Sequence, residues 1–318
     1  MTVGDQEAGR VHADSPALAA LVPATARVEK IAEGFVWSEG PVWIRNGNYL
    51  LLSDVPANRM YRWSEADGLS VFLDPSGCDG PDPSAFREPG SNGLIPGPAG
   101  TILVADHGNR AVASVDLATR QKSFLATLYE GRRFNSPNDL VLGRDGSIWF
   151  TDPPYGLQGL NASPLKEQPV NGVYRLRPGG KVELVVEDMT FPNGILLSAD
   201  ECTLFVANSD SERPVVLAFA LDAAGQVKGR EVFADFSELV SPRLPGLPDG
   251  MAIDVAGNMF ITGPGGVHIF SAGGARLGRI DTGRKVANCT FGEDGRTLFI
   301  ASSEMLVRVR TRTRGLGY

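Results

Sequence analysis

Six segments of the chain share one pattern, in which a residue with a side-chain oxygen opens an apolar run. The leading residues are, in chain order, Glu39, Asn92, Asn138, Asn193, Asp249 and Asn288. Carboxylate and carboxamide oxygens are the ligands that hard cations such as Ca²⁺ prefer in proteins. If the six segments are equivalent units of one ring, their leading side chains converge on its axis. The sequence then predicts a metal site built from distant parts of the chain.

A smaller set of these residues has the charge that a divalent cation needs. Two carboxylates and two amide oxygens, with positions left open for water, are offered by Glu39, Asn138, Asn193 and Asp249. No His or Cys stands at any of the six positions, which argues against a site selective for zinc. For each residue alone the alternative is an ordinary turn, because Asn-Gly and Asp-Gly pairs are common turn signals. The shared register of the set favours the metal site.

The elements that must position these residues recur with the same spacing. The leading residues stand 39 to 56 positions apart, and a second apolar strand follows each of them, ending in a residue 14 or 15 positions further on. The predicted second strands are Tyr49–Val55, Thr101–His107, Ser147–Pro153, Thr203–Ser209, Asn258–Pro264 and Thr297–Ser303. With third and fourth strands after them, the repeats predict an all-β fold, a six-bladed β-propeller with four antiparallel strands per blade. A pair of β-sandwiches is the alternative, but it does not account for six copies in one register.

The last repeat leaves little chain for a fourth strand after Arg312, whereas Val28–Ala32 forms a spare strand before the first repeat. We therefore expect this N-terminal strand to close the ring as the outer strand of the last blade, which removes an exposed edge. These boundaries divide the chain into an N-terminal extension, residues 1–26, a single propeller domain, residues 27–312, and a C-terminal tail, residues 313–318.

Composition and the chain ends narrow the possible functions. The 318 residues carry a formal net charge of −7 with no basic stripe, so nucleic acid is not an expected partner. The three cysteines are too widely spaced for a disulfide framework or a zinc motif, and Cys202 and Cys289 are expected to be buried.

The apolar run at residues 17–22 lacks the basic flank and the length of a signal peptide. The expected location is therefore cytoplasmic, without a membrane partner, and the oligomeric state is left open.

Four motifs carry a resemblance to a known family, namely Glu39-Gly-Pro-Val-Trp, Ser136-Pro-Asn-Asp-Leu, Phe191-Pro-Asn-Gly-Ile and Leu247-Pro-Asp-Gly-Met. They resemble the senescence marker protein/gluconolactonase/luciferin-regenerating enzyme family, from about residue 28 to residue 311. Asp106-His-Gly-Asn-Arg and Phe150-Thr-Asp-Pro-Pro-Tyr-Gly are similar to its bacterial gluconolactonase-like branch. The resemblance implies a six-bladed propeller, a divalent metal on its axis and hydrolysis of sugar lactones.

The resemblance also implies roles for single residues. The family's metal ligands fall on Glu39, Asn138, Asn193 and Asp249. The metal is expected to be Ca²⁺, with Zn²⁺, Mn²⁺ and Mg²⁺ as alternatives. Animal members have an arginine that contacts the sugar two places before the Asn of the Asn-Asp pair, where this chain has Ser136. The substrate can therefore be a different lactone.

For a lactonase, two residues are candidates for the chemical steps. A cation at this site would polarise the lactone carbonyl and stabilise the oxyanion while a water molecule attacks. Asp249 is the candidate proton acceptor, with metal ligation alone as the alternative. His107 is the candidate proton donor to the leaving alkoxide or a substrate contact, with a structural role as the alternative.

The remaining candidates surround the expected pocket. Asn92 and Asn138 are candidate substrate contacts, and Tyr155 is another, although core packing explains Tyr155 equally well. Asp139 either orients the metal ligands from behind or caps a turn. The Pro- and Gly-rich segment Asp74–Pro89 and the insertion Gln158–Val170 are expected to be loops that set substrate size.

Three functions are compatible with the predicted propeller and its axial residues. The leading one is a metal-dependent lactonase, a carboxylic ester hydrolase. A calcium-dependent phosphotriesterase on the same scaffold is the second, because a fold alone does not separate the two chemistries. The third is a non-catalytic propeller that serves as an interaction module, for which small neutral residues would be expected on the axis in place of Glu39 and Asp249.

Overall fold

The fold consists almost entirely of β-strands. The computed structural model describes residues 6–80 and 85–318. Within these ranges there is no α-helix, and short 3₁₀ helices such as Pro16–Ala20, Arg45–Gly47 and Leu160–Ala162 interrupt the strands. None of the described helices is long and apolar enough to cross a membrane. The prediction of an all-β fold is therefore confirmed.

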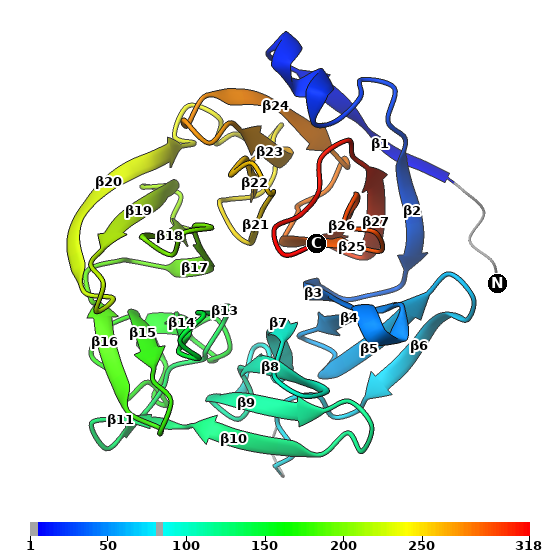
Figure 1. The fold of residues 1–318 in the computed structure, drawn as a ribbon. Coiled ribbons are helices and arrows are strands. Elements are labelled where there is room, and N and C mark those ends of the chain that lie inside the picture. Colours follow the sequence, from blue (N-terminus) through cyan, green and yellow to red (C-terminus); the bar gives the residue numbers. More distant parts are fainter. Residues whose placement is uncertain (1–5, 81–84) are drawn as a thin grey trace.

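Four antiparallel sheets of four strands each follow one another along the chain. Their strands are β3 (Ser38–Ile44), β4 (Tyr49–Asp54), β5 (Arg59–Ser64) and β6 (Gly68–Leu73); β7 (Ser91–Pro96), β8 (Thr101–Asp106), β9 (Ala111–Asp116) and β10 (Lys122–Ala126); β13 (Leu140–Leu142), β14 (Ile148–Asp152), β15 (Gly172–Leu176) and β16 (Val182–Val186); and β17 (Pro192–Leu197), β18 (Thr203–Asn208), β19 (Val215–Leu221) and β20 (Val227–Asp235). A short hairpin, β11 (Leu128–Tyr129) and β12 (Arg132–Arg133), lies between the second and third sheets. The first strand of each sheet lies nearest a common axis (Figure 1).

The remaining strands form one nine-stranded sheet in the order β21-β22-β23-β24-β1-β2-β27-β26-β25. Its strands are β21 (Met251–Ile253), β22 (Met259–Gly263), β23 (Gly266–Phe270), β24 (Arg276–Asp281), β25 (Asn288–Gly292), β26 (Thr297–Ser302), β27 (Met305–Arg310), β1 (Gln6–Ala13) and β2 (Val28–Glu33). The predicted N-terminal closing strand is confirmed, because β2 pairs antiparallel with β27. Figure 1 shows β2 running along the outside of β27, next to the first sheet.

Strand β1 is an element that the sequence did not reveal. Its first part pairs with β2, and Arg10–Ala13 pairs with β24, so this strand joins two groups of strands into one sheet. The register shifts between Glu7 and Gly9, where a Cβ on Gly9 would lie 1.9 Å from the carbonyl oxygen of Asp281. A glycine is therefore required where the strand passes from one partner to the other. The extension proposed to end at residue 26 thus contributes sheet structure from residue 6 onward.

The core is divided into hydrophobic clusters that lie between neighbouring sheets. One cluster joins Leu51 and Met60 of the first sheet to Ile102 and Val104 of the second. Another joins Trp149 of the third sheet to strands of the fourth. These side chains are almost fully buried, and each contributes about 1.5–3 kcal/mol on leaving water. Packing between sheets, rather than one central core, therefore holds the ring of sheets together.

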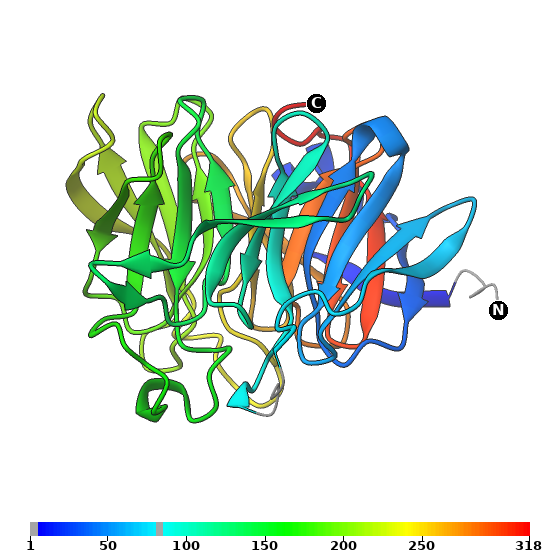
Figure 2. The ribbon, with the colours of Figure 1, turned by 90° about the horizontal axis from the view of Figure 1, so that it is seen from below.

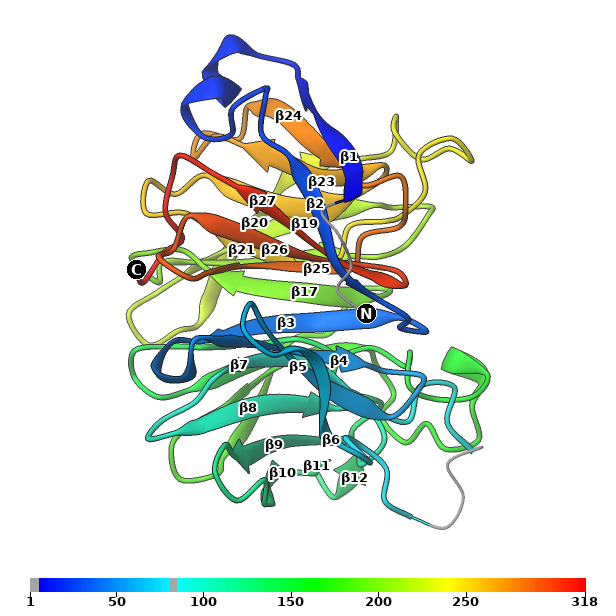
Figure 3. The ribbon, with the colours of Figure 1, turned by 90° about the vertical axis from the view of Figure 1, so that its right-hand side faces the viewer.

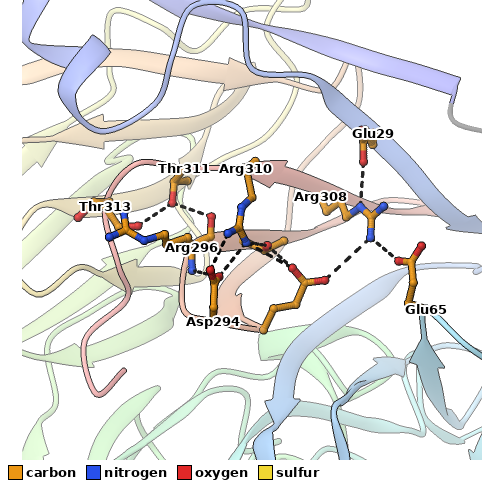
Figure 4. Close-up of polar contacts among 10 residues, drawn as sticks. Glu29, Glu65, Asp294, Arg296, Arg308, Arg310, Thr311 and Thr313 are labelled. Carbon is orange, nitrogen blue, oxygen red and sulfur yellow. Dashed lines mark hydrogen bonds and ion pairs between the residues drawn. The ribbon is translucent and has the colours of Figure 1, made fainter.

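Charged side chains reinforce the place where the two ends of the chain meet. Arg308 of β27 donates from Nε to Glu29 of β2, at 2.9 Å, and from Nη1 to Glu65 in the turn between β5 and β6, at 2.5 Å (Figure 4). Arg308 and Glu29 are partly exposed and Glu65 is largely exposed. Ion pairs open to solvent contribute about 1 kcal/mol or less each, so these pairs support a closure that strand pairing and burial produce.

The rest of the chain follows the predicted repeat, with one correction. The six predicted second strands are present as β4, β8, β14, β18, β22 and β26. The predicted tail also packs on the fold, because the Tyr318 hydroxyl donates to the carbonyl of Phe291 at 2.7 Å. Cys289 is buried as expected, but the prediction for Cys202 is wrong, because this thiol is exposed at the turn into β18. All three cysteines are free thiols.

Candidate functional site

One cavity of about 640 Å³ collects most of the leading residues of the repeats. Its lining includes five of the six: Glu39, Asn92, Asn138, Asn193 and Asp249. The sixth, Asn288, is turned into the protein, where its Oδ1 accepts a hydrogen bond from the N–H of Cys289 at 2.8 Å. The structure thus brings together the four predicted metal ligands and the predicted substrate contact Asn92.

The repeat register has a physical cause in the polar residues that end the second strands. Three of these side chains accept hydrogen bonds from backbone N–H groups just before a leading residue: Asp54 from Val36 and Trp37, Asp152 from Asn135, and Asn208 from Phe191. Each bond ties the incoming loop to the neighbouring strand of the same sheet. The spacing of 14 or 15 residues is therefore the length of the hairpin that carries both partners.

An Asn-Gly pair usually signals a turn. The glycines after several leading residues instead lie where neighbouring strands touch. A Cβ on Gly194 would lie 2.1 Å from the carbonyl oxygen of Asp249, and a Cβ on Gly40 would lie 2.2 Å from that of Asn92. Each of these glycines thus allows the first strand of one sheet to touch that of the next. The close approach brings the leading side chains to one point near the axis.

The carboxylates of the site have unusual electrostatics. Burial raises the pKa of Glu39 to about 8, and the N–H of Gly40 opposes this shift only in part. Burial also raises the pKa of Asp249 well above its ordinary value, and repulsion from Glu39 adds to this effect. The pKa of Asp139 rises to about 7, again because of burial. Among the described residues, no Lys or Arg forms an ion pair with Glu39 or Asp249.

This donor set fits a divalent cation. Two carboxylates close to one another and without a cationic partner are costly to bury, and a bound cation removes that cost. Two carboxamides, Asn138 and Asn193, face the same cavity and offer neutral oxygens. Within the described ranges no group of three or more His, Cys, Asp or Glu side chains could hold a metal, so a site here depends on the amides.

Three segments that connect strands contribute residues to the cavity, and Figure 2 shows these connections on one face of the ring. They are the end of the predicted loop Asp74–Pro89, of which residues 81–84 lie outside the described part; the segment after β14; and the segment between β20 and β21. The first two are joined by a bridge between Phe86 and Leu157 and by the N–H of Arg87, which donates to Gly156 at 3.0 Å. The C-terminus lies at the opposite face (Figure 3).

The segment after β14 carries Tyr155, which lines the cavity as predicted. Its ring stacks on Phe191 at a centroid distance of 5.7 Å, and its hydroxyl donates to the carbonyl of Ser209 at 3.4 Å. Burial raises the pKa of this phenol far above its ordinary value, with Asp249 adding to the shift. Tyr155 is therefore a neutral wall of the cavity that both packs and presents a hydroxyl.

Ser136, the position at which the resemblance implies an arginine in animal proteins, is fully buried. Its hydroxyl donates to the carbonyl of Pro153 at 2.6 Å and accepts from the N–H of Gly156 at 2.9 Å. A Cβ on Gly156 would lie within 3.0 Å of Ser136 and His107, so this place has no room for a longer side chain. Ser136 fixes the loop that carries Tyr155 and does not reach the cavity.

His107 is fully buried and is not among the residues that line the cavity. Its Nε2 lies 3.2 Å from Nδ2 of Asn92 and 3.4 Å from Nδ2 of Asn138, so the ring stands behind these two carboxamides. Asp139 is also buried, and its Oδ1 accepts from the N–H of Leu140 at 2.9 Å. Both residues support the cavity from within the protein.

Several cavity residues were missed by the sequence analysis. They are chiefly Trp37, Arg87, Glu88, Ser209 and Lys285. Ser209 and His107 stand at the same place, directly after the last residue of a second strand, and this was the signal that could have identified Ser209. Arg87 and Glu88 carried no signal of this kind, because a loop outside the repeat delivers them.

A second hollow, of about 670 Å³, lies at the outer edge of the ring, lined by residues 128–130, 180–185 and 225–227. It contains none of the leading residues of the repeats. Its charged side chains, Glu130, Lys181 and Glu183, belong to exposed strands and turns. The two hollows are similar in volume, so their chemistry, and not their size, identifies the axial cavity as the candidate site.

Comparison with known proteins identifies the family to which this fold belongs. Residues 37–304 match the SMP-30/gluconolactonase/LRE-like region. A gluconolactonase of Zymomonas mobilis is 48% identical over 311 residues, which cover 96% of this chain and 87% of that protein. A solved gluconolactonase of Xanthomonas campestris is 32% identical with a TM-score of 0.82, covering 96% of each chain. A calcium-binding regucalcin of Agrobacterium tumefaciens, 18% identical over 90% of this chain and 94% of its own, shares the fold with a TM-score of 0.70. The chain therefore belongs to the SMP-30/gluconolactonase/LRE-like family.

Proposed function

We propose that this protein hydrolyses the ester bond of sugar lactones and related aldonolactones. The chain is a lactonase, a carboxylic ester hydrolase, as its 48% identity with a gluconolactonase over most of both chains supports. The observation that carries the proposal for the site is the convergence of Glu39, Asn138, Asn193 and Asp249 on one cavity. A non-catalytic interaction module would not need two carboxylates, the buried Glu39 and the partly buried Asp249, in one cavity at a cost in stability.

We assign the four converging residues as the ligands of a divalent cation, with Ca²⁺ as the first candidate. The absence of His and Cys among the lining residues and the predominance of carboxylate and amide oxygens favour a hard cation. When bound, such a cation supplies Lewis-acid activation of the lactone carbonyl and stabilisation of negative charge on its oxygen. Regucalcin, a relative in fold, is a calcium-binding protein, which supports this choice.

In this proposal the chain's own residues transfer the proton and bind the lactone. Asp249 accepts the proton of the attacking water, because it is a carboxylate at the cavity wall. Asn92 and Tyr155 hydrogen-bond the lactone, and the stacked pair of Tyr155 and Phe191 gives it an apolar wall. The surrounding loops limit access of bulk water.

We also interpret the ring as six blades. In this interpretation the nine-stranded sheet consists of two four-stranded units, β21 to β24 and β25 to β27 with β2, which β1 connects at their outer edges. Hydrophobic clusters between neighbouring units support the division. Residues 27–312 then form one domain with the cavity on its axis.

Removal of metal is expected to abolish lactone hydrolysis. Without the cation the site lacks the Lewis acid that would polarise the lactone carbonyl and stabilise the charge developing on its oxygen, so turnover should fall by about 10²–10³-fold or more. The test compares glucono-1,5-lactone, γ-lactones and a phosphotriester, with protein stripped by a chelator and then supplied with Ca²⁺, Zn²⁺, Mn²⁺ or Mg²⁺. Full activity of the stripped protein would contradict the metal assignment, and preference for the phosphotriester would contradict the lactonase.

Metal binding is expected to strengthen as the pH rises to about 8. A ligand carboxylate must lose its proton, and the pKa of Glu39 in the metal-free protein is about 8. Below that pH the apparent affinity should fall by up to about tenfold per pH unit for each proton displaced. Calorimetric titration with Ca²⁺ at several pH values, in two buffers of different ionisation enthalpy, measures the released protons. Proton release that is absent at pH 6.5 would contradict the assignment of Glu39.

The same pKa determines the pH dependence of stability without metal. The folded protein holds the Glu39 proton more tightly than the unfolded chain does, where the ordinary value is 4.5. Between these two pKa values the folded state therefore binds more protons, and its stability should fall as the pH rises from about 4.5 through 8. Bound metal should remove this loss.

A further inference from the structure

Two carboxamides of the site have their nitrogens directed away from the cavity and toward a single imidazole. Nδ2 of Asn92 and Nδ2 of Asn138 lie 3.2 Å and 3.4 Å from Nε2 of His107. An amide nitrogen only donates, so a ring nitrogen that faces two of them must carry a lone pair and no proton. Held in this way, Asn138 presents its oxygen to the cavity, which is the orientation that a cation requires.

The third carboxamide shows the same arrangement with a different partner. Nδ2 of Asn193 donates to the hydroxyl of Ser209 at 2.9 Å, and this hydroxyl in turn donates to the carbonyl of Pro248. Because the hydroxyl proton is already engaged, the Ser209 oxygen acts as an acceptor toward Asn193. His107 and Ser209 both follow the last residue of a second strand, so two repeats use one position to orient an amide.

A neutral imidazole with a free Nε2 carries its proton on Nδ1. Nδ1 of His107 lies 3.4 Å from Oε2 of Glu88, without the alignment of a hydrogen bond, and has no other partner among the described residues. The ring is fully buried, whereas the Glu88 side chain is 13% exposed and lines the cavity. An ionised carboxylate only accepts, so its position next to Nδ1 favours the tautomer that leaves Nε2 free.

Glu88 is itself held in place by the loop that precedes the second sheet. Its Oε1 lies 3.1 Å from Nη2 of Arg87, and the backbone N–H groups of Arg87 and Glu88 both donate to the carbonyl of Gly156. The loop after β14 therefore fixes the carboxylate that faces His107. The chain of contacts runs from a surface loop, through a buried ring, to two carboxamides at the cavity.

We propose that Glu88 and His107 are positioning residues, in which Glu88 selects the Nδ1–H tautomer of His107 and the free Nε2 then turns the oxygens of Asn92 and Asn138 toward the cavity. This inference rests on the proposed cation site, because its functional consequence is the strength of cation binding. It assigns to His107 an indirect role, in place of proton transfer to the substrate. Partners that orient metal ligands in this way typically change metal affinity by about 10–100-fold.

The tautomer can be read directly, without metal or substrate. The chain has three histidines, and long-range ¹H–¹⁵N spectra of the histidine-labelled full chain distinguish the two neutral tautomers. His268 provides an internal reference of the opposite kind, because its Nε2 lies 2.8 Å from the carbonyl oxygen of Pro264 and must donate to it. Burial lowers the pKa of His268 to about 4, so it is neutral at pH 8. We expect Nδ1–H for His107 and Nε2–H for His268.

Substitutions of Glu88 distinguish its proposed effect on the His107 tautomer from a direct effect of its negative charge on cation binding. Glu88→Ala removes the acceptor for Nδ1–H and should shift His107 toward the Nε2–H tautomer, with Ca²⁺ binding weakened by about 10-fold or more in calorimetry. Glu88→Gln has no charge but keeps an acceptor oxygen, so it should retain the wild-type tautomer and most of the affinity. Circular dichroism and thermal unfolding check that both variants fold.

Each outcome supports or overturns the proposal. An Nε2–H tautomer of His107 in the wild-type protein would overturn it, as would an equal loss of Ca²⁺ affinity in Glu88→Ala and Glu88→Gln, which indicates a charge effect alone. If the wild-type chain binds none of the divalent cations, the proposed metal site fails, and the tautomer measurement still decides whether Glu88 controls His107.

Discussion

Replacing Asp249 by Asn is expected to lower kcat/KM for lactones by about 10³-fold and, without metal, to leave the protein at least as stable as the wild type. The carboxylate lies at the cavity wall beside Glu39, and burial and repulsion from Glu39 raise its pKa. A carboxamide of the same shape removes a general base, which is worth about 10²–10⁴-fold, and one of the two negative charges that balance a divalent cation. It also removes the repulsion within the pair, so chemical denaturation should show no loss of unfolding free energy.

Comparison with Glu39→Gln decides whether Asp249 is a base as well as a ligand. If both residues only bind the cation, saturating Ca²⁺ should restore much of the turnover of either variant. If Asp249 also accepts the proton, kcat of Asp249→Asn should stay low at saturating Ca²⁺ while Glu39→Gln recovers. Asp294→Asn, in the turn at the far end of β25, is the control and should keep wild-type activity. Wild-type turnover by Asp249→Asn without any gain in metal requirement would contradict both roles.

Asp249→Asn should lower activity without lowering stability because of how the site is built. Glu39 and Asp249 lie in one cavity without an ion pair to any described Lys or Arg, so the metal-free fold carries an electrostatic cost that a bound cation would remove. Active sites commonly trade stability for function in this way. A variant that had merely unfolded would lose both stability and activity, so the combination of lower activity and retained stability identifies a role in the chemistry.

The parts of the fold that local sequence encodes could be predicted. The second strands are runs of apolar and β-branched residues that end in a polar side chain, and all six are present within a residue or two of the predicted bounds. The closing strand β2 was also predictable, because the final repeat lacked an outer partner. Strand β1 was not, since polar residues make up half of Gln6–Ala13 and do not alternate clearly with apolar ones. It pairs with β2, the next strand along the chain, and also with β24, a distant strand that comes next to it only in the closed ring.

The candidate site was predictable to the extent that it follows the repeat. The shared register of Glu39, Asn138, Asn193 and Asp249 sufficed to predict that they line one cavity. Asn288 departs from this pattern. It is followed by Cys289, where most other leading residues are followed by glycine, and its carboxamide oxygen accepts a hydrogen bond from the N–H of Cys289. The approach of Glu88 to His107 was beyond sequence reasoning, since it depends on the path of an irregular loop and on its contact with Gly156.

Gly194→Ala is expected to destabilise the protein by about 3 kcal/mol or more and to reduce activity at the same time. The new Cβ would lie 2.1 Å from the carbonyl oxygen of Asp249 and 2.8 Å from Cα of Gly250, both of which are backbone atoms. No side chain can move aside to make room, so β17 and the segment before β21 must separate. Overpacking usually costs about 1–3 kcal/mol where side chains can adjust, and here they cannot.

The displacement acts directly on the site, because the same contact holds Asn193 and Asp249 at their separation. A shift of about 1 Å in catalytic geometry can cost about 10²-fold in rate, so the folded fraction of Gly194→Ala should also show a lower kcat/KM and weaker Ca²⁺ binding. Gly229→Ala is the matched control, since Gly229 lies in β20 with no atom within 4 Å of the added Cβ. It should leave the denaturation midpoint and activity close to wild type. A Gly194→Ala protein with wild-type stability and activity would show that the first strands tolerate wider spacing, and that close contact between neighbouring sheets does not set the position of Asp249.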